Sequence, residues 1–276
     1  MFLALSQHVP IGHVIPLPQY DNRVSIVNNG TWSLMSNICP HQNSRIVKCA
    51  TDHNHLQCPY HGLKFDHNGA GVDNGYTLEK WPAYQNQTML FDQHVSCTFP
   101  IDTQHMMLIE QRQDVVNASP ATIMDVFLDI DHIPVAHAGV YEQIGITGIG
   151  DLTWSTFENG SIQFVPAREG MDMVLEDRQY NLGACWMAVY PGTMIEWQPG
   201  ALFVTVAHSI DETTSRVQVY KYKDNRYWEE AWAMNQQVWE TAWAQDRELA
   251  ESIVYPAVEN LDELKQHYMV WKQDAV

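Results

Sequence analysis

Two stretches decide the fold: Cys-Pro-His at residues 39–41, and Cys-Pro-Tyr-His at residues 58–61, which Gly62 follows. Each offers one thiolate and one imidazole, and its proline helps to stiffen the turn between them. Two such turns facing each other can hold either one tetrahedral zinc ion or a two-iron cluster. A single residue between Cys39 and His41 is unusual for a zinc finger, whose histidines typically sit together on a helix. The spacing therefore favours the cluster over zinc.

Short apolar runs and turn-forming residues alternate through the first hundred residues. The runs VSIVNN (24–29) and TWSLMS (31–36) meet at an Asn-Gly pair, which is a strong signal for a β-hairpin. We therefore expect a small all-β domain over residues 1–100 that carries both Cys-His turns.

The rest of the chain, residues 101–276, has a different pattern. Residues 121–139 begin with helical spacing of apolar side chains, and Pro134 should kink or end that helix because proline lacks the backbone N–H. Between residues 151 and 222, six strand-like runs separated by turn formers predict an antiparallel meander. The runs are SIQFVPA, MDMVLEDRQY, CWMAVYP, TMIEWQP, ALFVTVAHSI and RVQVYKYK.

Residues 225–253 predict one long amphipathic helix with tryptophans repeating on one face. These are Trp228, Trp232, Trp239 and Trp243. Asp246 falls on the same face, where a carboxylate is unfavourable unless it is paired or binds a cation. Arg247 points elsewhere, so a salt bridge would need another buried arginine. The second domain is therefore expected to be α+β, with a helix, a curved antiparallel sheet and a long closing helix.

Asp129, His132 and His137 form a second group of candidate metal ligands. On a regular helix Asp129 and His132 share a face, whereas His132 and His137 diverge by about 140°. A distortion near Pro134 is therefore needed for the imidazoles to converge. Alone, two histidines near a helix end are usually ordinary residues. With Asp246 they complete two imidazoles and one carboxylate, the donor set of the Fe(II) facial triad.

Composition narrows the functional classes. The chain has 33 acidic and 15 basic side chains and a formal net charge of -18, which excludes general binding to nucleic acid or to an anionic membrane. No apolar run approaches the ~18 residues that a membrane-spanning helix needs. Neutral imidazole is a common transition-metal ligand, so the 13 histidines draw attention to where they cluster.

The cysteines are sparse and odd in number, and the N-terminal residues make a poor signal peptide. They are Cys39, Cys49, Cys58, Cys97 and Cys185. This pattern predicts a reducing cytoplasm and argues against a disulfide framework. Cys49 lies between the two Cys-His turns, and we expect it to be a buried apolar residue.

The motif CPH followed by CPYHGLKFD closely resembles the Rieske [2Fe-2S] domain. The resemblance implies that Cys39 and Cys58 hold one iron and that His41 and His61 hold the other. Gln42 stands where the family usually has arginine, which bears on cluster docking but not on ligation. Imidazoles in place of two thiolates remove negative charge, so the reduction potential should exceed that of an all-cysteine ferredoxin.

Together with the later motifs, the chain resembles the terminal oxygenase (α) subunits of Rieske non-haem iron oxygenases, the ring-hydroxylating oxygenase family. The resemblance implies a helix-grip catalytic domain over residues 101–276, with mononuclear Fe(II) on His132, His137 and Asp246. It also implies a head-to-tail homotrimer, in which one subunit's cluster feeds the neighbour's iron. Asp129 would bridge the two centres by hydrogen bonds to a histidine on each side.

The expected function is O₂-dependent hydroxylation or oxidative demethylation of a small organic substrate. Electrons would come from NAD(P)H through a separate reductase or ferredoxin. A short chain in an α-only trimer resembles the monooxygenase and demethylase branches more than the aromatic cis-dihydroxylating dioxygenases, which remain an alternative. Two alternatives of another class are a Rieske electron-transfer or regulatory protein without oxygenase activity, and a zinc-binding interaction module.

Basic residues predominate between Cys39 and Lys64, where Arg45, Lys48 and Lys64 are accompanied only by Asp52. In so acidic a chain this excess suggests a docking patch for an acidic ferredoxin-like donor. A chance cluster of solvated charges is an equal alternative.

Several large side chains on the predicted strands are candidates for lining a substrate pocket. The sequence does not show which face of each strand points inward, so they are equally candidates for the core. They are Trp154, Phe164, Trp186, Met194, Trp197 and His208.

Overall fold

The computed structural model describes residues 1–48, 55–95, 103–129, 132–140, 192–198 and 200–253, together with strands lying between residues 152 and 189. The chain divides into two compact units, Met1–Phe99 and Pro100–Val276. No helix within these described ranges is long and apolar enough to cross a bilayer.

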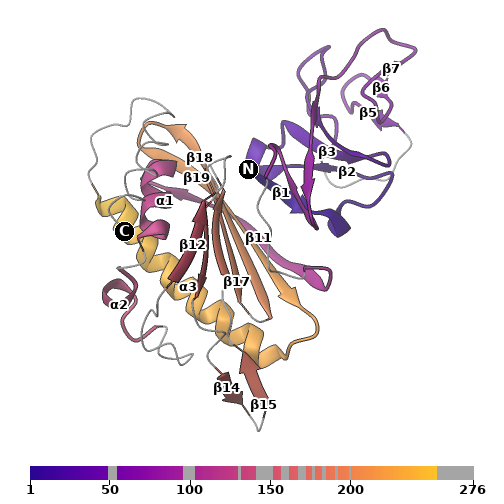
Figure 1. Ribbon diagram of the computed structural model, residues 1–276. Coiled ribbons are helices and arrows are strands. Elements are labelled where there is room, and N and C mark those ends of the chain that lie inside the picture. Colours follow the sequence, from indigo (N-terminus) through magenta and orange to yellow (C-terminus); the bar gives the residue numbers. More distant parts are fainter. Residues whose placement is uncertain are drawn as a thin grey trace. The chain divides into compact units, whose positions relative to one another are not determined.

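The described part of the first unit consists of short antiparallel strands in three small sheets (Figure 1). Their strand orders are β1-β10-β9, β2-β3-β4-β8 and β5-β6-β7. The strands are β1 (Phe2–Leu5), β2 (Val14–Pro16), β3 (Val24–Asn28), β4 (Trp32–Ser36), β5 (Leu56–Gln57), β6 (Lys64–Phe65), β7 (Gly71–Val72), β8 (Lys80–Pro82), β9 (Tyr84–Asn86) and β10 (Met89–Phe91). Short 3-10 helices span Ser6–His8 and Pro18–Tyr20.

The predicted hairpin is formed by β3 and β4, which pair antiparallel with Asn28 opposite Trp32. Gly30 in the connection has φ +102°, a region that side chains with a Cβ rarely adopt. From this hairpin Val27 and Met35 pack into an apolar cluster that also contains Cys39 and Cys58. The core of the unit therefore extends directly to the two Cys-His turns.

The second unit has an antiparallel sheet of seven described strands, with a long helix across one face (Figure 1). The order is β11-β19-β18-β17-β16-β13-β12. The strands are β11 (Met106–Val116), β12 (Leu152–Thr156), β13 (Ile162–Pro166), β16 (Cys185–Val189), β17 (Thr193–Gln198), β18 (Ala201–Asp211) and β19 (Thr214–Asp224). The helices are α1 (Pro120–Leu128), α2 (Ile133–Ala136) and α3 (Glu229–Ser252). The expected α+β architecture is confirmed.

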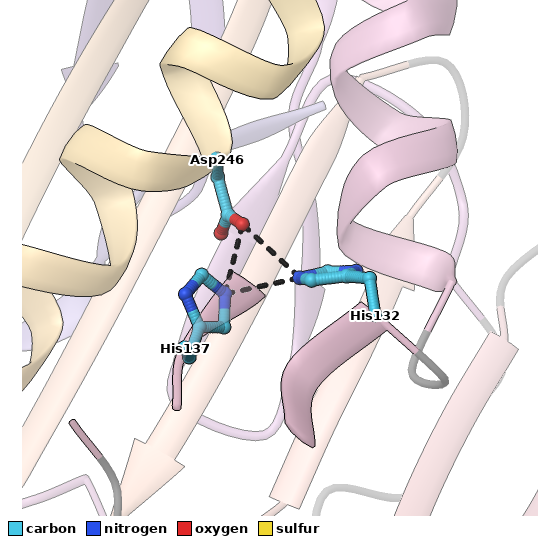
Figure 2. Close-up of side chains that lie close together, drawn as sticks. All are labelled: His132, His137 and Asp246. Atoms are coloured by element: carbon cyan, nitrogen blue, oxygen red, sulfur yellow. Dashed lines mark hydrogen bonds and ion pairs between the residues drawn. The ribbon is translucent and has the colours of Figure 1, made fainter. Parts of the chain in front are cut away.

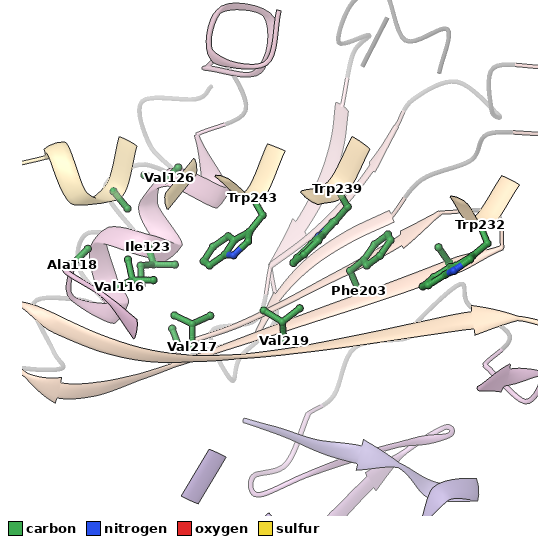
Figure 3. Packing of buried hydrophobic residues seen from close by; sticks show 13 residues of the cluster. Val116, Ala118, Ile123, Val126, Phe203, Val217, Val219, Trp232, Trp239 and Trp243 are labelled. Carbon is green, nitrogen blue, oxygen red and sulfur yellow. The ribbon is translucent and has the colours of Figure 1, made fainter. Parts of the chain in front are cut away.

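Helix α3 is held against the sheet by its tryptophans (Figure 3). It begins at Glu229, so Trp228 is the N-cap residue and not part of the predicted stripe. Phe203 of β18 stacks on Trp232 and Trp239, with ring centroids 6.0 and 5.1 Å apart. Burial of these large rings fixes the side of α3 that faces the sheet.

The sheet differs from its predicted form in three places, one of which is the edge strand β12, which lies outside the six predicted runs. The run MDMVLEDRQY forms β14 (Asp172–Leu175) and β15 (Arg178–Asn181), which pair with each other outside the seven-stranded sheet. Edge strand β11 was not predicted, and its inward positions are charged. Arg112 reaches Glu240 of α3 at 2.7 Å, and Asp114 accepts a hydrogen bond from Trp243 at 3.2 Å. Charged inward positions remove the apolar alternation that signals a strand.

The predicted helix over residues 121–139 is two helices. Helix α1 starts after Ser119, whose Oγ accepts a hydrogen bond from the Thr122 N–H at 3.1 Å, and it ends at Leu128. Pro134 lies in the first turn of α2, where its missing N–H costs no hydrogen bond. The proline therefore belongs to the start of a new helix instead of kinking a continuous one.

Candidate metal centres

The two Cys-His turns share one backbone design. The N–H of each cysteine donates to the carbonyl five residues later, at 2.8 Å in both turns. The residue four positions later donates back to the cysteine carbonyl, at 2.9 Å from Asn43 and 3.0 Å from Gly62. These two residues have φ 53° and 74°, the left-handed conformation that glycine and asparagine tolerate best. Equivalent backbones thus underlie the unequal spacings Cys-x-His and Cys-x-x-His.

The four side chains of these turns separate into a sulfur side and a nitrogen side. Cys39 and Cys58 are each 1% exposed and lie within hydrogen-bonding reach of each other. His41 and His61 are exposed, and their ring centroids are 4.7 Å apart. This donor set fits a cluster with one iron on two thiolates and the other on two imidazoles.

The two thiols differ in their electrostatic surroundings. Burial raises the pKa of Cys39, although the backbone N–H of His41 partly offsets it. Burial also acts to raise the pKa of Cys58, but the backbone N–H of Tyr60 and other donors, including the Ser44 side chain, more than offset it and lower this pKa. These donors stabilise the thiolate, which is the form that binds iron.

The basic residues predicted to dock a donor, Arg45, Lys48 and Lys64, are exposed. Arg45 lies 3.9 Å from Asp21, an exposed acid outside the stretch in which charges were counted. Docking of the electron donor by charge therefore stays a prediction. The local excess of positive charge is smaller than the sequence suggested, because Asp21 offsets part of it. Cys49 and Asp52 lie outside the described residues.

His132, His137 and Asp246 converge in the second unit (Figure 2). The two histidines flank α2 as its N-cap and C-cap residues, and Asp246 reaches them from α3. The Nε2 atoms of the histidines are 3.0 Å apart. Asp246 Oδ1 lies 3.1 Å from Nε2 of His132 and 2.9 Å from Nε2 of His137.

These three atoms form a nearly equilateral triangle with sides of 2.9, 3.0 and 3.1 Å. Adjacent ligands of an octahedral metal ion with bonds of ~2.1 Å are about 3.0 Å apart, whereas tetrahedral ligands are about 3.4 Å apart. The triangle is compatible with one face of an octahedron, and its sides are also the lengths of hydrogen bonds among the three side chains. Two imidazoles and one carboxylate on such a face are the donor set of non-haem Fe(II) sites.

Gln245 is a site residue that the sequence did not single out. Its Oε1 accepts a hydrogen bond from His137 Nδ1 at 2.8 Å, and His137 Nε2 faces Asp246. Burial lowers the pKa of His137, but the hydrogen bond and negative charge of Asp246 outweigh burial, and the pKa is raised. The one sequence feature that could have identified Gln245 as a site residue is its position next to Asp246.

Asp129 does not orient His132 within the chain. It is the exposed C-cap residue of α1, and Nδ1 of His132 is buried without a hydrogen-bond partner among the described residues. The shared helical face on which the contact was predicted does not exist, because α1 ends at Leu128. Bridging between subunits stays a prediction.

A buried carboxyl group, that of Glu196 on β17, lies near this centre and was not singled out from the sequence. Glu196 is 8% exposed and lies opposite Phe203 of β18, on the face that carries α3. Its carboxyl group accepts a hydrogen bond from the Trp239 indole. Burial first, and then the negative charge of Asp246, raise its pKa to about 8, partly offset by His137 and Trp239. The sequence feature that could have singled out Glu196 is the presence of an acidic residue inside the apolar run TMIEWQP.

The predicted pocket residues divide between the two faces of the sheet. Met194 is buried on the face of β17 that carries Glu196. Alternation along β17 and β18 places Trp197 and His208 on the opposite face, away from α3. The remaining candidates lie in register with Glu196 across the sheet, and their side chains are outside the described part: Trp154, Phe164 and Trp186.

Comparison with known proteins identifies the domain that carries the two Cys-His turns. A family model for the Rieske [2Fe-2S] domain matches residues 1–85. Putrescine 2-hydroxylase from Ralstonia nicotianae is 22% identical over 262 residues, which cover 79% of this chain and 71% of that protein. The oxygenase component of dicamba O-demethylase from Stenotrophomonas maltophilia is 29% identical over 103 residues, 37% of this chain and 28% of that protein.

Solved structures extend the likeness to the second unit. The quaternary ammonium Rieske monooxygenase CntA, in complex with L-carnitine, has a TM-score of 0.69 at 14% identity and covers 91% of this chain and 76% of that one. A mutant of NdmA from Pseudomonas putida CBB5, in a structure with theobromine, has a TM-score of 0.55 at 15% identity. The match covers 91% of this chain and 79% of that one. The first unit is a Rieske [2Fe-2S] domain, and the chain as a whole has the fold of Rieske oxygenase α subunits.

Proposed function

We propose that this protein is an O₂-dependent oxygenase that hydroxylates or oxidatively demethylates a small organic substrate. The observation that carries the proposal is the triangle of His132, His137 and Asp246, with sides of 2.9–3.1 Å. These residues would hold Fe(II), which supplies O₂ activation when bound. A metal held by only three protein ligands would keep positions for O₂ and substrate.

Electrons would be supplied from NAD(P)H through a separate reductase or ferredoxin. The turns with Cys39, His41, Cys58 and His61 would hold a [2Fe-2S] cluster, which supplies one-electron transfer. The exposed imidazoles lie on the solvent side of these turns, where a redox partner can approach. The buried thiols lie on the side that packs into the core.

The protein itself contributes orientation and shielding at the mononuclear site. Gln245 fixes the ring of His137 through Nδ1, and His137 is only 2% exposed. Trp243, which precedes Asp246 by one helical turn, is 4% exposed and stacks on Phe127 of α1. Rigid packing around the ligands limits the access of bulk water to the site.

The branch of chemistry is inferred from the relatives. The relatives named above include a hydroxylase and a demethylase, and their substrates differ. This favours monooxygenation or demethylation over aromatic cis-dihydroxylation, without naming the substrate. A head-to-tail homotrimer, with exposed Asp129 linking the cluster of one subunit to the iron of the next, belongs to the same proposal.

The test of the mononuclear site is Asp246→Ala, with Glu248→Ala on the exposed side of α3 as the matched control. We expect the iron content to fall from about three to about two per chain, because only the cluster iron is retained. The cluster absorbance and electron paramagnetic resonance signal should stay unchanged. Substrate-dependent O₂ uptake, screened across N-methyl, O-methyl and aromatic compounds, should fall to background.

Full iron content in Asp246→Ala would refute the ligand assignment. Full iron content in the wild type without O₂ uptake on any compound would instead favour the electron-transfer alternative. A colourless wild-type protein lacking the cluster signal would favour the zinc-binding alternative. The Glu248→Ala protein must match the wild type in all three measurements.

A further inference from the structure

Glu196 lies close to the mononuclear site without belonging to its ligand set. Its charge interacts with those of Asp246 and His137, yet only His132, His137 and Asp246 offer ligand atoms within 4.8 Å of one another in the described part. Its carboxyl group is buried on the α3 side of β17, where it accepts a hydrogen bond from Trp239. The carboxyl group is therefore part of the surroundings in which a substrate would sit.

Two other acids on this side of the sheet, Glu110 and Glu240, are partly exposed and pair with basic side chains. Lys221, with a side chain 0% exposed, pairs with Glu110 at 2.7 Å and also with Glu240. Arg112 binds Glu240 at 2.7 Å. Within the described ranges, the positive charge that acts on Glu196 is that of the His137 imidazole, a candidate metal ligand. A buried carboxylate needs a counter-charge, and the described residues supply a lysine or arginine for Glu110 and Glu240 but not for Glu196.

An acceptor that has no donor in the described part of the chain follows on the same face of β17. Gln198 is 5% exposed, and its Oε1 has no hydrogen-bond partner in the described part of the chain. Two residues along a strand bring the side chains roughly 7 Å apart on one face. A buried carboxyl group followed by an unpartnered amide oxygen on one face suits a ligand that carries positive charge and N–H donors.

Building on the proposed oxygenase function, we propose that Glu196 is the counter-charge for a cationic substrate, a small alkylammonium ion. The charge of the bound ammonium ion favours the ionised form of Glu196, whose carboxylate accepts from the ammonium N–H groups, and Gln198 accepts from a second N–H donor. The buried side chain of Met194 on the same face contacts the alkyl chain. A carboxylate beside the metal site thus selects amines over neutral compounds of the same shape and sets which carbon faces the iron.

The test compares charged and neutral ligands of equal size on the holoenzyme. Hexylammonium and 1,4-diammoniobutane are titrated against 1-hexanol and 1,4-butanediol, with binding followed by calorimetry and by tryptophan fluorescence. The wild type should prefer the ammonium compounds by about tenfold or more, as expected for a charge-assisted hydrogen bond. Glu196→Gln, which retains an acceptor for Trp239, should lose this preference while keeping its affinity for the alcohols.

Glu248→Gln makes the same change of charge on the exposed side of α3 and should behave as the wild type. Iron content, cluster spectrum and thermal unfolding of Glu196→Gln must match the wild type, so that lost binding is not lost folding. Glu196→Asp, which keeps the charge and shortens the side chain, should retain part of the preference.

A wild type without preference for either ammonium compound, or a Glu196→Gln protein that keeps the preference, overturns the inference. If amines bind in a Glu196-dependent way but stimulate no O₂ uptake, the cation site is supported and the oxygenase proposal is refuted. O₂ uptake stimulated only by neutral compounds upholds the oxygenase and removes the cation site.

Discussion

In the first unit, the Cys and His ligands lie on two turns that close within themselves, through hydrogen bonds to residues four and five positions away. In the second unit, two ligands flank a four-residue helix, and the third arrives from α3. The hydrogen bond between His137 and Gln245 spans 108 residues of sequence. One centre is thus made by local turn chemistry, and the other by the docking of distant elements.

This difference determines how each centre should respond to change. The cluster turns depend on residues with φ 53° and 74° and on an apolar core behind the sulfurs. The mononuclear site depends on α3 keeping its register over the sheet and against α1, to within the few tenths of an ångström that separate octahedral from tetrahedral ligand spacing. Changes to packing should therefore harm the iron site and spare the cluster.

The largest effect is expected where the two centres must communicate. Asp129→Asn should leave cluster and iron content unchanged yet reduce substrate-coupled turnover by at least about 100-fold, because the amide cannot replace a carboxylate that accepts from both sides. Its exposed position at the end of α1 suits a contact with a second subunit. Turnover is measured with the electron donor in excess. Normal turnover of the Asp129→Asn protein would refute the bridging role of Asp129.

Trp243→Ala tests the dependence of the iron site on packing. Trp243 is 4% exposed, stacks on Phe127 and Trp239, and donates a hydrogen bond to Asp114. Its removal should destabilise the second unit by about 3–5 kcal/mol and lower the iron content, while the cluster spectrum persists. Denaturant unfolding and metal analysis measure these effects. Parallel loss of cluster and iron would contradict the independence of the two centres.

A smaller effect is expected from Gln245→Leu, which removes the acceptor for His137 Nδ1 without touching a ligand. Affinity for Fe(II) should fall about 10- to 100-fold, because the imidazole loses the hydrogen bond that sets its tautomer and orientation. Gln245→Glu keeps an acceptor and should retain most of the affinity. Competition with a chelator measures both. Unchanged affinity in the leucine variant would show that packing alone orients His137.

Much of the cluster could be predicted from the sequence because turns are local. Cys39, His41, Cys58 and His61 stand out by spacing, and the Asn-Gly hairpin that supports them was confirmed. The tryptophan face of α3 and the burial of Asp246 also follow from helical periodicity. The break between α1 and α2 was less accessible, because Pro134 suits both the interior kink that was predicted and the helix start that exists.

The sequence by itself determined which residues could bind metal, since thiolates, imidazoles and a misplaced carboxylate are recognisable by type and spacing. Only the tertiary structure decided what surrounds them. It turned Glu196 toward α3 and Trp197 away from it, it brought Gln245 to His137, and it left Asp129 exposed. The physical reason is register: alternation along a strand has a period of two, so the face of every side chain depends on pairing between strands that no local pattern specifies.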